Sequence, residues 1–127
     1  QFLKPIFNPF ASPREIFELL MDSKKHAGFT GHKARISSAR NGKFEAYDGW
    51  IQGKNLEIVK YKKIMQSWRG ADWKKGYYSK AEFKLESKGK GCKLTFTHTG
   101  VPDEHYKGIN KGWKEHYWQK MKKYLRS

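Results

Sequence analysis

Residues 101–125 read VPDEHYKGINKGWKEHYWQKMKKYL, and this stretch decides the fold. Large apolar side chains recur in it every three or four residues, which is the spacing of one face of an α-helix. The sequence therefore predicts a helix over residues 103–125, about five turns long, with one stripe made mostly of rings. The stripe consists of Tyr106, Ile109, Trp113, Tyr117, Met121 and Tyr124.

The region before this helix has the two-residue period of β-strands. Apolar and charged residues alternate between residues 33 and 98, most clearly over Tyr77–Glu86, as they do in a strand with one buried face and one solvated face. Asn41-Gly42 is typical of a tight hairpin turn, because both central residues of such a turn need positive φ. We therefore expect five or six antiparallel strands in this region.

The N-terminal part predicts a strand followed by a helix. Leu3–Phe10 has the pattern of a strand. Ser12 can cap the following helix, Pro13 suits its first position, and Glu15 completes a capping box. The order of strand, helix, antiparallel strands and long terminal helix predicts the α+β class, with the helices set against one face of an antiparallel sheet.

Length and composition limit the class of protein. The chain has 127 residues, enough for one ordinary domain, and we expect a single domain over residues 1–127. Aromatic residues make up 16% of it, which argues against intrinsic disorder. No run is apolar enough for a membrane span, and no secretory signal is visible. The single Cys excludes an internal disulfide. We expect a cytoplasmic protein.

The chain is strongly basic, with 27 Lys and Arg against 12 Asp and Glu and a net charge of +15. Such a field attracts polyanions. The basic residues are scattered in pairs such as Lys24-Lys25 and Lys122-Lys123, without the block of like charge that marks a basic tail. We interpret most of them as a solubilising surface and expect weak, non-specific binding of polyanions. A dedicated nucleic-acid surface is the alternative.

A set of residues between Trp68 and Leu125 resembles a known family. Its members are Trp68-Arg69, Asp72-Trp73, Gly76, Tyr78-Ser79, Phe83, Thr95, Gly100-Val101-Pro102, Gly112-Trp113, Tyr117-Trp118 and Tyr124-Leu125. The pattern is similar to that of the activator of heat-shock protein 90 ATPase homologue family, in particular its C-terminal-domain type, a branch of the START-like (SRPBCC) superfamily. The resemblance covers nearly the whole chain.

The resemblance implies a fold and a function. The fold is the helix-grip fold of START-like and birch-pollen-allergen-like proteins, in which a curved antiparallel sheet wraps around a long C-terminal helix. Such domains often hold an apolar cavity between sheet and helix. The function implied is that of a stress-response co-chaperone module that binds a heat-shock protein 90 type chaperone. Full activators carry a separate N-terminal domain, for which 127 residues leave no room.

The inward faces of the predicted strands and helix supply candidates for contact with a small apolar ligand. They are Phe44, Trp50, Ile58, Trp68, Phe83, Leu94, Phe96, Trp113, Tyr117 and Met121. A register error of one residue would exchange the strand members. Gly108 and Gly112 lie four residues apart on the predicted helix. We interpret them first as points of close helix–sheet contact and second as space for a ligand.

Trp73 is the candidate for contact with a partner protein. It lies in the polar loop Gly70–Gly76, where neither strand alternation nor a helical stripe accounts for a large ring. An exposed ring of this kind often carries much of the binding energy of an interface. The alternative is that Trp73 folds over the edge of the sheet.

We predict no catalytic residue, metal site or cofactor. The histidines lack the spacing of metal ligands, and we interpret all of them as surface or rim residues; they are His26, His32, His98, His105 and His116. Cys92 has no base within reach and is expected in the core or a cavity wall. The predicted function is therefore non-enzymatic binding of a chaperone. A carrier of small hydrophobic ligands unrelated to chaperones and a nucleic-acid-binding protein remain the alternatives.

Overall fold

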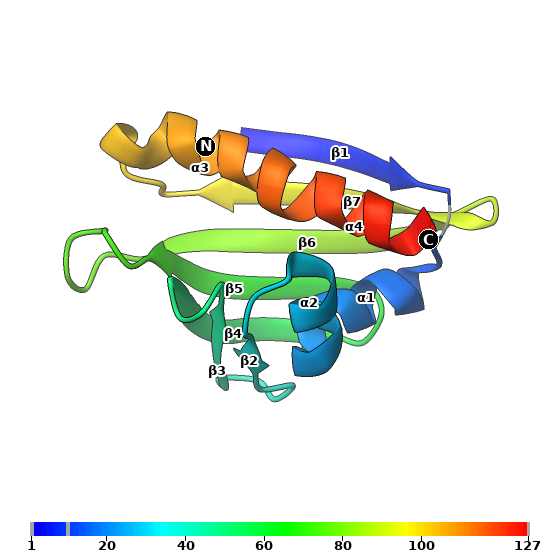
Figure 1. The fold of residues 1–127 in the computed structure, drawn as a ribbon, viewed down its shortest axis with the longest axis horizontal. Coiled ribbons are helices and arrows are strands. Elements are labelled where there is room, and N and C mark those ends of the chain that lie inside the picture. Colours follow the sequence, from blue (N-terminus) through cyan, green and yellow to red (C-terminus); the bar gives the residue numbers. More distant parts are fainter. Residues whose placement is uncertain (1, 10, 127) are drawn as a thin grey trace.

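A seven-stranded antiparallel sheet forms the body of the protein in a computed structural model that describes residues 2–9 and 11–126 (Figure 1). Neighbouring strands pair in the order β1-β7-β6-β5-β4-β3-β2. The predicted strand at the N-terminus is confirmed as far as Asn8, and Phe10 lies outside the described residues. The strands are β1 (Phe2–Asn8), β2 (Arg35–Ile36), β3 (Lys43–Ala46), β4 (Ile51–Val59), β5 (Lys63–Gly70), β6 (Ser79–Lys88) and β7 (Gly91–Thr99).

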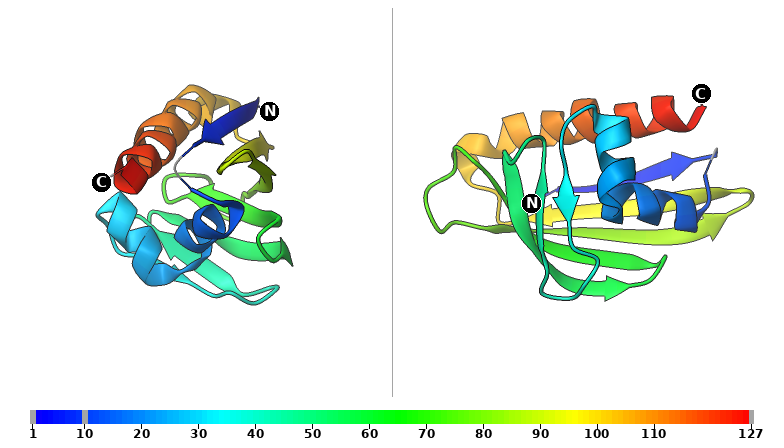
Figure 2. Two further views of the ribbon diagram at one scale, coloured as in Figure 1. Left: turned by 90° about the vertical axis from the view of Figure 1, so that its right-hand side faces the viewer. Right: turned by 60° about the horizontal axis from the view of Figure 1, so that its bottom comes forward.

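The helices lie on one face of the sheet, which curves around the C-terminal helix (Figure 2). This arrangement confirms the α+β class, the helix-grip fold and the long terminal helix. No helix in the described residues is both long enough and apolar enough to cross a membrane. The helical segments are α1 (Pro13–Met21), α2 (Ser23–Thr30), η1 (Asp103–His105), α3 (Tyr106–Trp113), η2 (Lys114–Trp118) and α4 (Gln119–Arg126).

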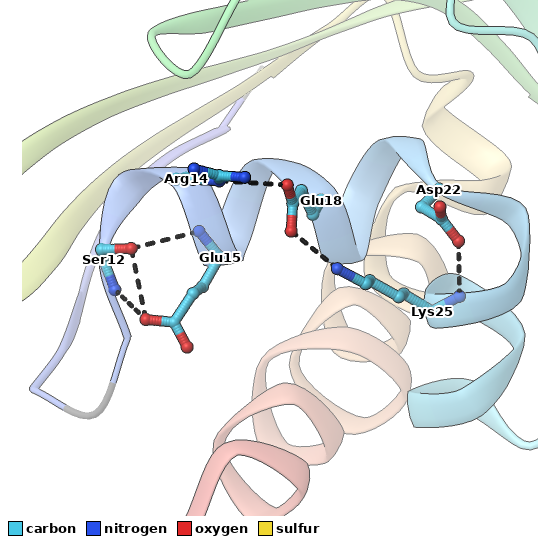
Figure 3. Close-up of polar contacts among 6 residues, drawn as sticks. All are labelled: Ser12, Arg14, Glu15, Glu18, Asp22 and Lys25. Atoms are coloured by element: carbon cyan, nitrogen blue, oxygen red, sulfur yellow. Dashed lines mark hydrogen bonds and ion pairs between the residues drawn. The ribbon is translucent and has the colours of Figure 1, made fainter.

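The corner between α1 and α2 is held by local polar contacts (Figure 3). Ser12 Oγ accepts a hydrogen bond from the Glu15 N–H at 3.2 Å, and the Ser12 N–H donates to Glu15 Oε1 at 3.1 Å, so the predicted capping box is present. Glu18 pairs with Lys25 across the corner at 2.6 Å. Asp22 accepts from the Lys25 N–H and so caps α2. These contacts hold α1 and α2 together at the corner.

A turn of π-helix interrupts the C-terminal helix and changes which side chains it buries. In η2 the hydrogen bonds run from i to i+5, so the turn is wider than in an α-helix. Tyr117 and Trp118 are therefore both buried, whereas Tyr124 is 43% exposed. The sequence stripe, which assumed a constant period, was wrong in including Tyr124 and in omitting Trp118.

A β-bulge in β4 has a similar effect on the sheet. Its register with β5 shifts between Asn55 and Glu57. Because a strand alternates strictly, the inward positions are odd-numbered before the bulge and even-numbered after it. Ile51 is therefore buried and Trp50 is 40% exposed, the reverse of the predicted register, while Ile58 packs against the core as predicted.

The connection between β2 and β3 differs from the predicted two-residue hairpin. It spans residues 37–42, and only Asn41 of the predicted pair has positive φ, at 66°. Gly42 is needed for another reason: a Cβ there would lie 2.1 Å from Ser37 Oγ. The glycine thus allows a close approach of two chain segments rather than a left-handed turn.

Candidate functional site

A cavity of about 460 Å³ opens between the first half of the C-terminal helix and one end of the sheet. Five of its fourteen lining residues are Trp or Tyr, and charged side chains occur beside the rings. The helix contributes Gly108, Ile109, Lys111, Gly112, Trp113, Glu115, His116 and Tyr117, and the sheet side contributes His32, Tyr47, Asp48, Trp50, Ile51 and Trp68. A volume of this size is in the range of small-molecule sites.

Two glycines leave the helical wall of this cavity open. A Cβ built on Gly108 would meet no atom within 4 Å, and one on Gly112 would meet only His116 Cδ2, at 3.8 Å. Neither glycine touches the sheet, so the interpretation as close helix–sheet contacts was wrong. Glycine is unfavourable inside a helix, by about 1 kcal/mol relative to Ala. The arrangement observed agrees with the second interpretation, in which the glycines leave space.

His32 and Asp48 form a polar pair in the cavity wall. His32 Nδ1 lies 2.8 Å from Asp48 Oδ2, and the Lys33 N–H donates to Asp48 Oδ1 at 2.9 Å. Hydrogen bonds from His32 and then from Lys33 lower the pKa of Asp48. Because Asp48 holds Nδ1, the other ring nitrogen of His32 is left to bond a ligand.

Tyr47 joins the polar pair to the helix. Its hydroxyl donates to the His116 carbonyl, and its ring lies 4.9 Å from that of His32. Burial raises the pKa of Tyr47 to about 12. Tyr47 and Asp48 both have positive φ, at 51° and 60°, a conformation that non-glycine residues adopt at a cost and often near functional sites.

His98 supports the cavity from within the core. Trp113 Nε1 donates to His98 Nδ1 at 3.0 Å, and His98 Nε2 lies 2.7 Å from Ser79 Oγ. Since indole is only a donor, Nδ1 must be unprotonated and the proton must lie on Nε2. Ser79 Oγ in turn donates a hydrogen bond to the Trp68 carbonyl. Burial lowers the pKa of His98 to about 3, so the ring stays neutral and holds the Trp113 indole in place.

A second buried histidine holds the other ring of the helix. His26 Nε2 lies 2.9 Å from the Tyr117 hydroxyl, which connects α2 to η2. His26 Nδ1 is near the Leu19 and Leu20 carbonyls but makes no hydrogen bond of good geometry. Burial lowers the pKa of His26 to about 4 and raises that of Tyr117 well above its ordinary value. The prediction that all histidines lie at the surface or rim was wrong for His26 and His98.

The predicted ligand-contacting residues fall into two groups. Trp50, Trp68, Trp113 and Tyr117 line the cavity. The others pack in the core away from it: Phe44, Phe83, Leu94, Phe96 and Met121 are buried, and Ile58 is partly buried. Alternation identifies a buried face but gives no indication of where that face is incompletely filled. Ligand contact by any of these residues stays a prediction.

Several residues of the cavity wall were missed by sequence reasoning. Tyr47 was expected to end a strand over residues 43–47, but it lies with Asp48 in the turn between β3 and β4, and His32 precedes β2. The signal that did point to the cavity was the glycine pair on the helix, which the sequence analysis interpreted first as packing.

Trp73 is not the exposed ring that the sequence suggested. Its side chain is 4% exposed and stacks on His105 with a centroid distance of 5.8 Å. Arg69 Nη2 donates to the Trp73 carbonyl at 2.7 Å and ties down the loop. Its ring contacts Trp68 of β5 and His105 of η1 at the end of two central strands, so it folds onto the sheet as in the alternative interpretation, but not over an edge strand. The exposed rings beside it are Tyr77 and Tyr78, at 41% and 50%.

A thiol and clusters of metal-ligating side chains are the other groups that could form a reactive centre. Cys92 is fully buried, as expected, and burial raises the pKa of its thiol to about 11, which makes it a poor nucleophile. Within the described residues, no group of three or more His, Cys, Asp or Glu side chains is placed to hold a metal ion.

The chain matches the family model described as "Activator of Hsp90 ATPase homolog 1-like protein" over residues 10–126. It is 29% identical to the activator of 90 kDa heat shock protein ATPase homolog of Dictyostelium discoideum over 112 residues, which are 87% of this chain and 29% of that protein. It is 25% identical to the human homolog 1 over 111 residues, 87% of this chain and 33% of that protein. The chain thus spans about a third or less of these relatives.

The fold has a close counterpart among solved structures. The crystal structure of an HSP90 activator from Plasmodium falciparum superposes with a TM-score of 0.87 at 23% identity, covering 98% of this chain and 96% of that one. The match agrees with the family model and with the sheet and helix described above. The chain belongs to the family of Activator of Hsp90 ATPase homolog 1-like proteins.

Proposed function

We propose that the chain is a single START-like domain that acts as a non-enzymatic, cytoplasmic co-chaperone module and binds an Hsp90-type chaperone. The observation that carries the proposal is the family match over residues 10–126. Relatives that align with 87% of the chain are named as activators of this chaperone's ATPase. The chain corresponds to about a third of those relatives, so the proposal is of binding, and stimulation of the ATPase is a separate outcome of its test.

The test is a titration of the purified chain with an Hsp90-type chaperone, with binding and ATP hydrolysis followed in parallel. We expect saturable binding that persists at about 0.15 M ionic strength, where surface electrostatics alone is largely screened. A rise in ATPase rate would extend the proposal from binding to activation. Absence of binding at this ionic strength would contradict the proposal.

A second function is favoured by the glycine-opened cavity. Its wall of Trp50, Trp68, Trp113 and Tyr117 rings suits a flat, mostly apolar molecule, and His32 offers one polar contact. Aromatic walls with a few placed polar groups are typical of small-molecule sites. In this case the protein would be a carrier of small hydrophobic ligands, with or without a chaperone as partner.

The cavity can be tested with the fluorescent probe anilinonaphthalene sulfonate. Gly112→Leu places a side chain in the cavity, because the space next to Gly112 is open. Asn110→Leu on the same helix is the control, since Asn110 is exposed and is not part of the cavity wall. We expect Gly112→Leu to abolish probe fluorescence and Asn110→Leu to preserve it. Equal fluorescence from both variants would place the probe elsewhere.

A further inference from the structure

The outer face of the sheet, turned away from the helices, is divided into two ends of different charge. At one end lie the outward side chains of Arg35, Lys43, Lys54, Arg69 and Lys80, with Glu45 as the carboxylate among them. We call this the basic end. At the other end Lys63, Lys84 and Lys93 alternate with Glu57, Glu82 and Glu86, and we call it the balanced end.

The balanced end is a network of ion pairs. Lys63 Nζ lies 2.8 Å from Glu57 Oε1 and 3.6 Å from Glu82 Oε2. Lys84 reaches the same Glu82 at 3.7 Å, and Lys93 reaches Glu86 at 4.0 Å. Lys63, Lys84 and Lys93 therefore each have a carboxylate partner within the protein. The charge of these three lysines is thus largely balanced within the sheet.

The basic end is built in the opposite way. Lys43 pairs directly with Lys54 across β3 and β4, Lys54 with Ser67, and Ser67 with Lys80 across β5 and β6. These positions form one straight row across four strands. In the described residues no carboxylate lies within ion-pair distance of the three exposed lysines of this row. Like charges directly opposite each other destabilise a sheet, so the Lys43–Lys54 pair lowers the stability of the isolated protein.

An exposed ring adds an apolar contact to this row. Tyr78 is 50% exposed, and the Arg69 guanidinium lies 5.8 Å from its ring centroid. Arg69 also donates from Nε and Nη2 to the Gly70 and Trp73 carbonyls. The guanidinium of Arg69 is thus bonded to the main chain, so the charges available to a partner molecule are the point charges of the lysines. The result is an exposed aromatic ring beside a positively charged row.

Charge complementarity requires a negatively charged partner. The number of exposed rings distinguishes between a nucleic acid and an acidic protein. Surfaces for single-stranded nucleic acid provide several rings on which successive bases stack, whereas Tyr78 is the one exposed ring that the described residues place against Arg69, and that guanidinium already bonds the main chain. Carboxylates at lysine point charges, with one apolar residue against the ring, match the acidic surface of a protein. We propose that the basic end is a docking surface for an acidic protein segment. This goes beyond the proposed function, since it assigns the surface and the chemistry of its partner rather than a particular chaperone.

The experiment compares two triple variants of the whole chain by NMR titration with polyglutamate at about 0.01 M ionic strength, where the Debye length is about 30 Å and exposed charges are little screened. Lys43→Gln/Lys54→Gln/Lys80→Gln removes the row. Lys88→Gln/Lys90→Gln/Lys93→Gln is the matched control, because it removes the same charge from the opposite end of the sheet. Shifts of amide signals in β4, β5 and β6 locate the bound probe, and thermal unfolding confirms that both variants are folded.

We expect the wild-type chain to bind polyglutamate with shifts centred on the basic end. Loss of the row should weaken binding about tenfold or more, a change of about 1.4 kcal/mol, and the control should change it by less than about twofold. Equal weakening by both triples, or no binding by the wild type, overturns the proposal. So does tighter binding of a mixed-sequence single-stranded RNA that depends on the same row, because the surface would then be a nucleic-acid site. None of these results requires the chaperone to bind.

Discussion

The space between the C-terminal helix and the sheet is filled at one end and open at the other. At the filled end Phe96 contacts the rings of Trp113 at 4.4 Å, Trp118 at 5.2 Å and Phe83 at 5.1 Å, and Trp113 stacks on Trp118. At the open end Gly108 and Gly112 leave the cavity wall bare.

The comparison shows that one helix serves two purposes through the size of its side chains. A helix packed with rings along its whole length would bind the sheet more strongly. Two glycines in its first half lower the helix propensity and remove packing contacts, and the space that they leave is the cavity. Trp113 lies at the junction, where it both packs on Phe96 and lines the cavity. The two ends should therefore respond differently to substitution.

The largest expected effect comes from removing a ring at the filled end. Phe96 is fully buried, so Phe96→Ala should lower the free energy of unfolding by about 3–5 kcal/mol. Trp50 at the open end is 40% exposed, and Trp50→Ala should lower it by roughly 1 kcal/mol. Denaturant unfolding at constant m-value measures both.

If Phe96→Ala does not fold, Phe96→Leu provides the same comparison on a smaller scale. Its expected loss of about 1–2 kcal/mol lies at or above that of Trp50→Ala. Equal losses at the two ends would mean that the cavity collapses in solution and that the helix is packed along its whole length.

The next effect concerns pH, because each end of the cavity wall is held by a neutral histidine. His98 and His26 have pKa values of about 3 and about 4 in the folded protein, against about 6.5 in the unfolded chain. Below pH 6.5 the unfolded chain therefore binds more protons, and stability falls as the pH falls towards the folded values. At pH 5 each histidine should account for a loss of about 2 kcal/mol.

Single variants separate this effect from general acid denaturation. His98→Gln keeps groups that can accept from Trp113 and donate to Ser79, and it should remove about half of the stability lost between pH 7 and pH 5. His116→Gln is the control because His116 is exposed. A pH slope that is unchanged in His98→Gln would show that the ring is already accessible to protons in the folded state.

Sequence alone predicted the architecture well because the two periods, of two and of about 3.6 residues, are global properties of long segments. It failed where one residue interrupts a period. The β-bulge after Asn55 moved Trp50 to the rim, and the π-turn over Lys114–Trp118 buried Trp118. Neither irregularity has a signal in composition, since each is set by how neighbouring elements pack.

The site was harder to predict than the fold. Its rings were identified as inward-facing, but a cavity is a property of the distance between elements, which no pattern in one segment determines. Trp73 illustrates the limit. A ring in a polar loop has no periodic partner, so only the tertiary contacts with His105 and Arg69 reveal that it is buried. Gly108 and Gly112 were the residues that indicated the cavity. Their role follows from the open space that a Cβ at either position would enter.

The smallest effect gives the sharpest test of the open end. Gly112 lies inside the continuous C-terminal helix, and a Cβ there would make one ordinary contact, with His116. Gly112→Ala should therefore raise the free energy of unfolding by about 0.5–1 kcal/mol, because Ala loses less backbone entropy in a helix. Gly108→Ala should act in the same direction. If the glycines instead allowed close helix–sheet packing, both substitutions would destabilise the protein, so the sign of the change in denaturation midpoint decides between the two. A stabilising Gly112→Ala that also weakens binding of anilinonaphthalene sulfonate would show that the chain gives up stability to keep the cavity open, as proteins do at sites that serve a function.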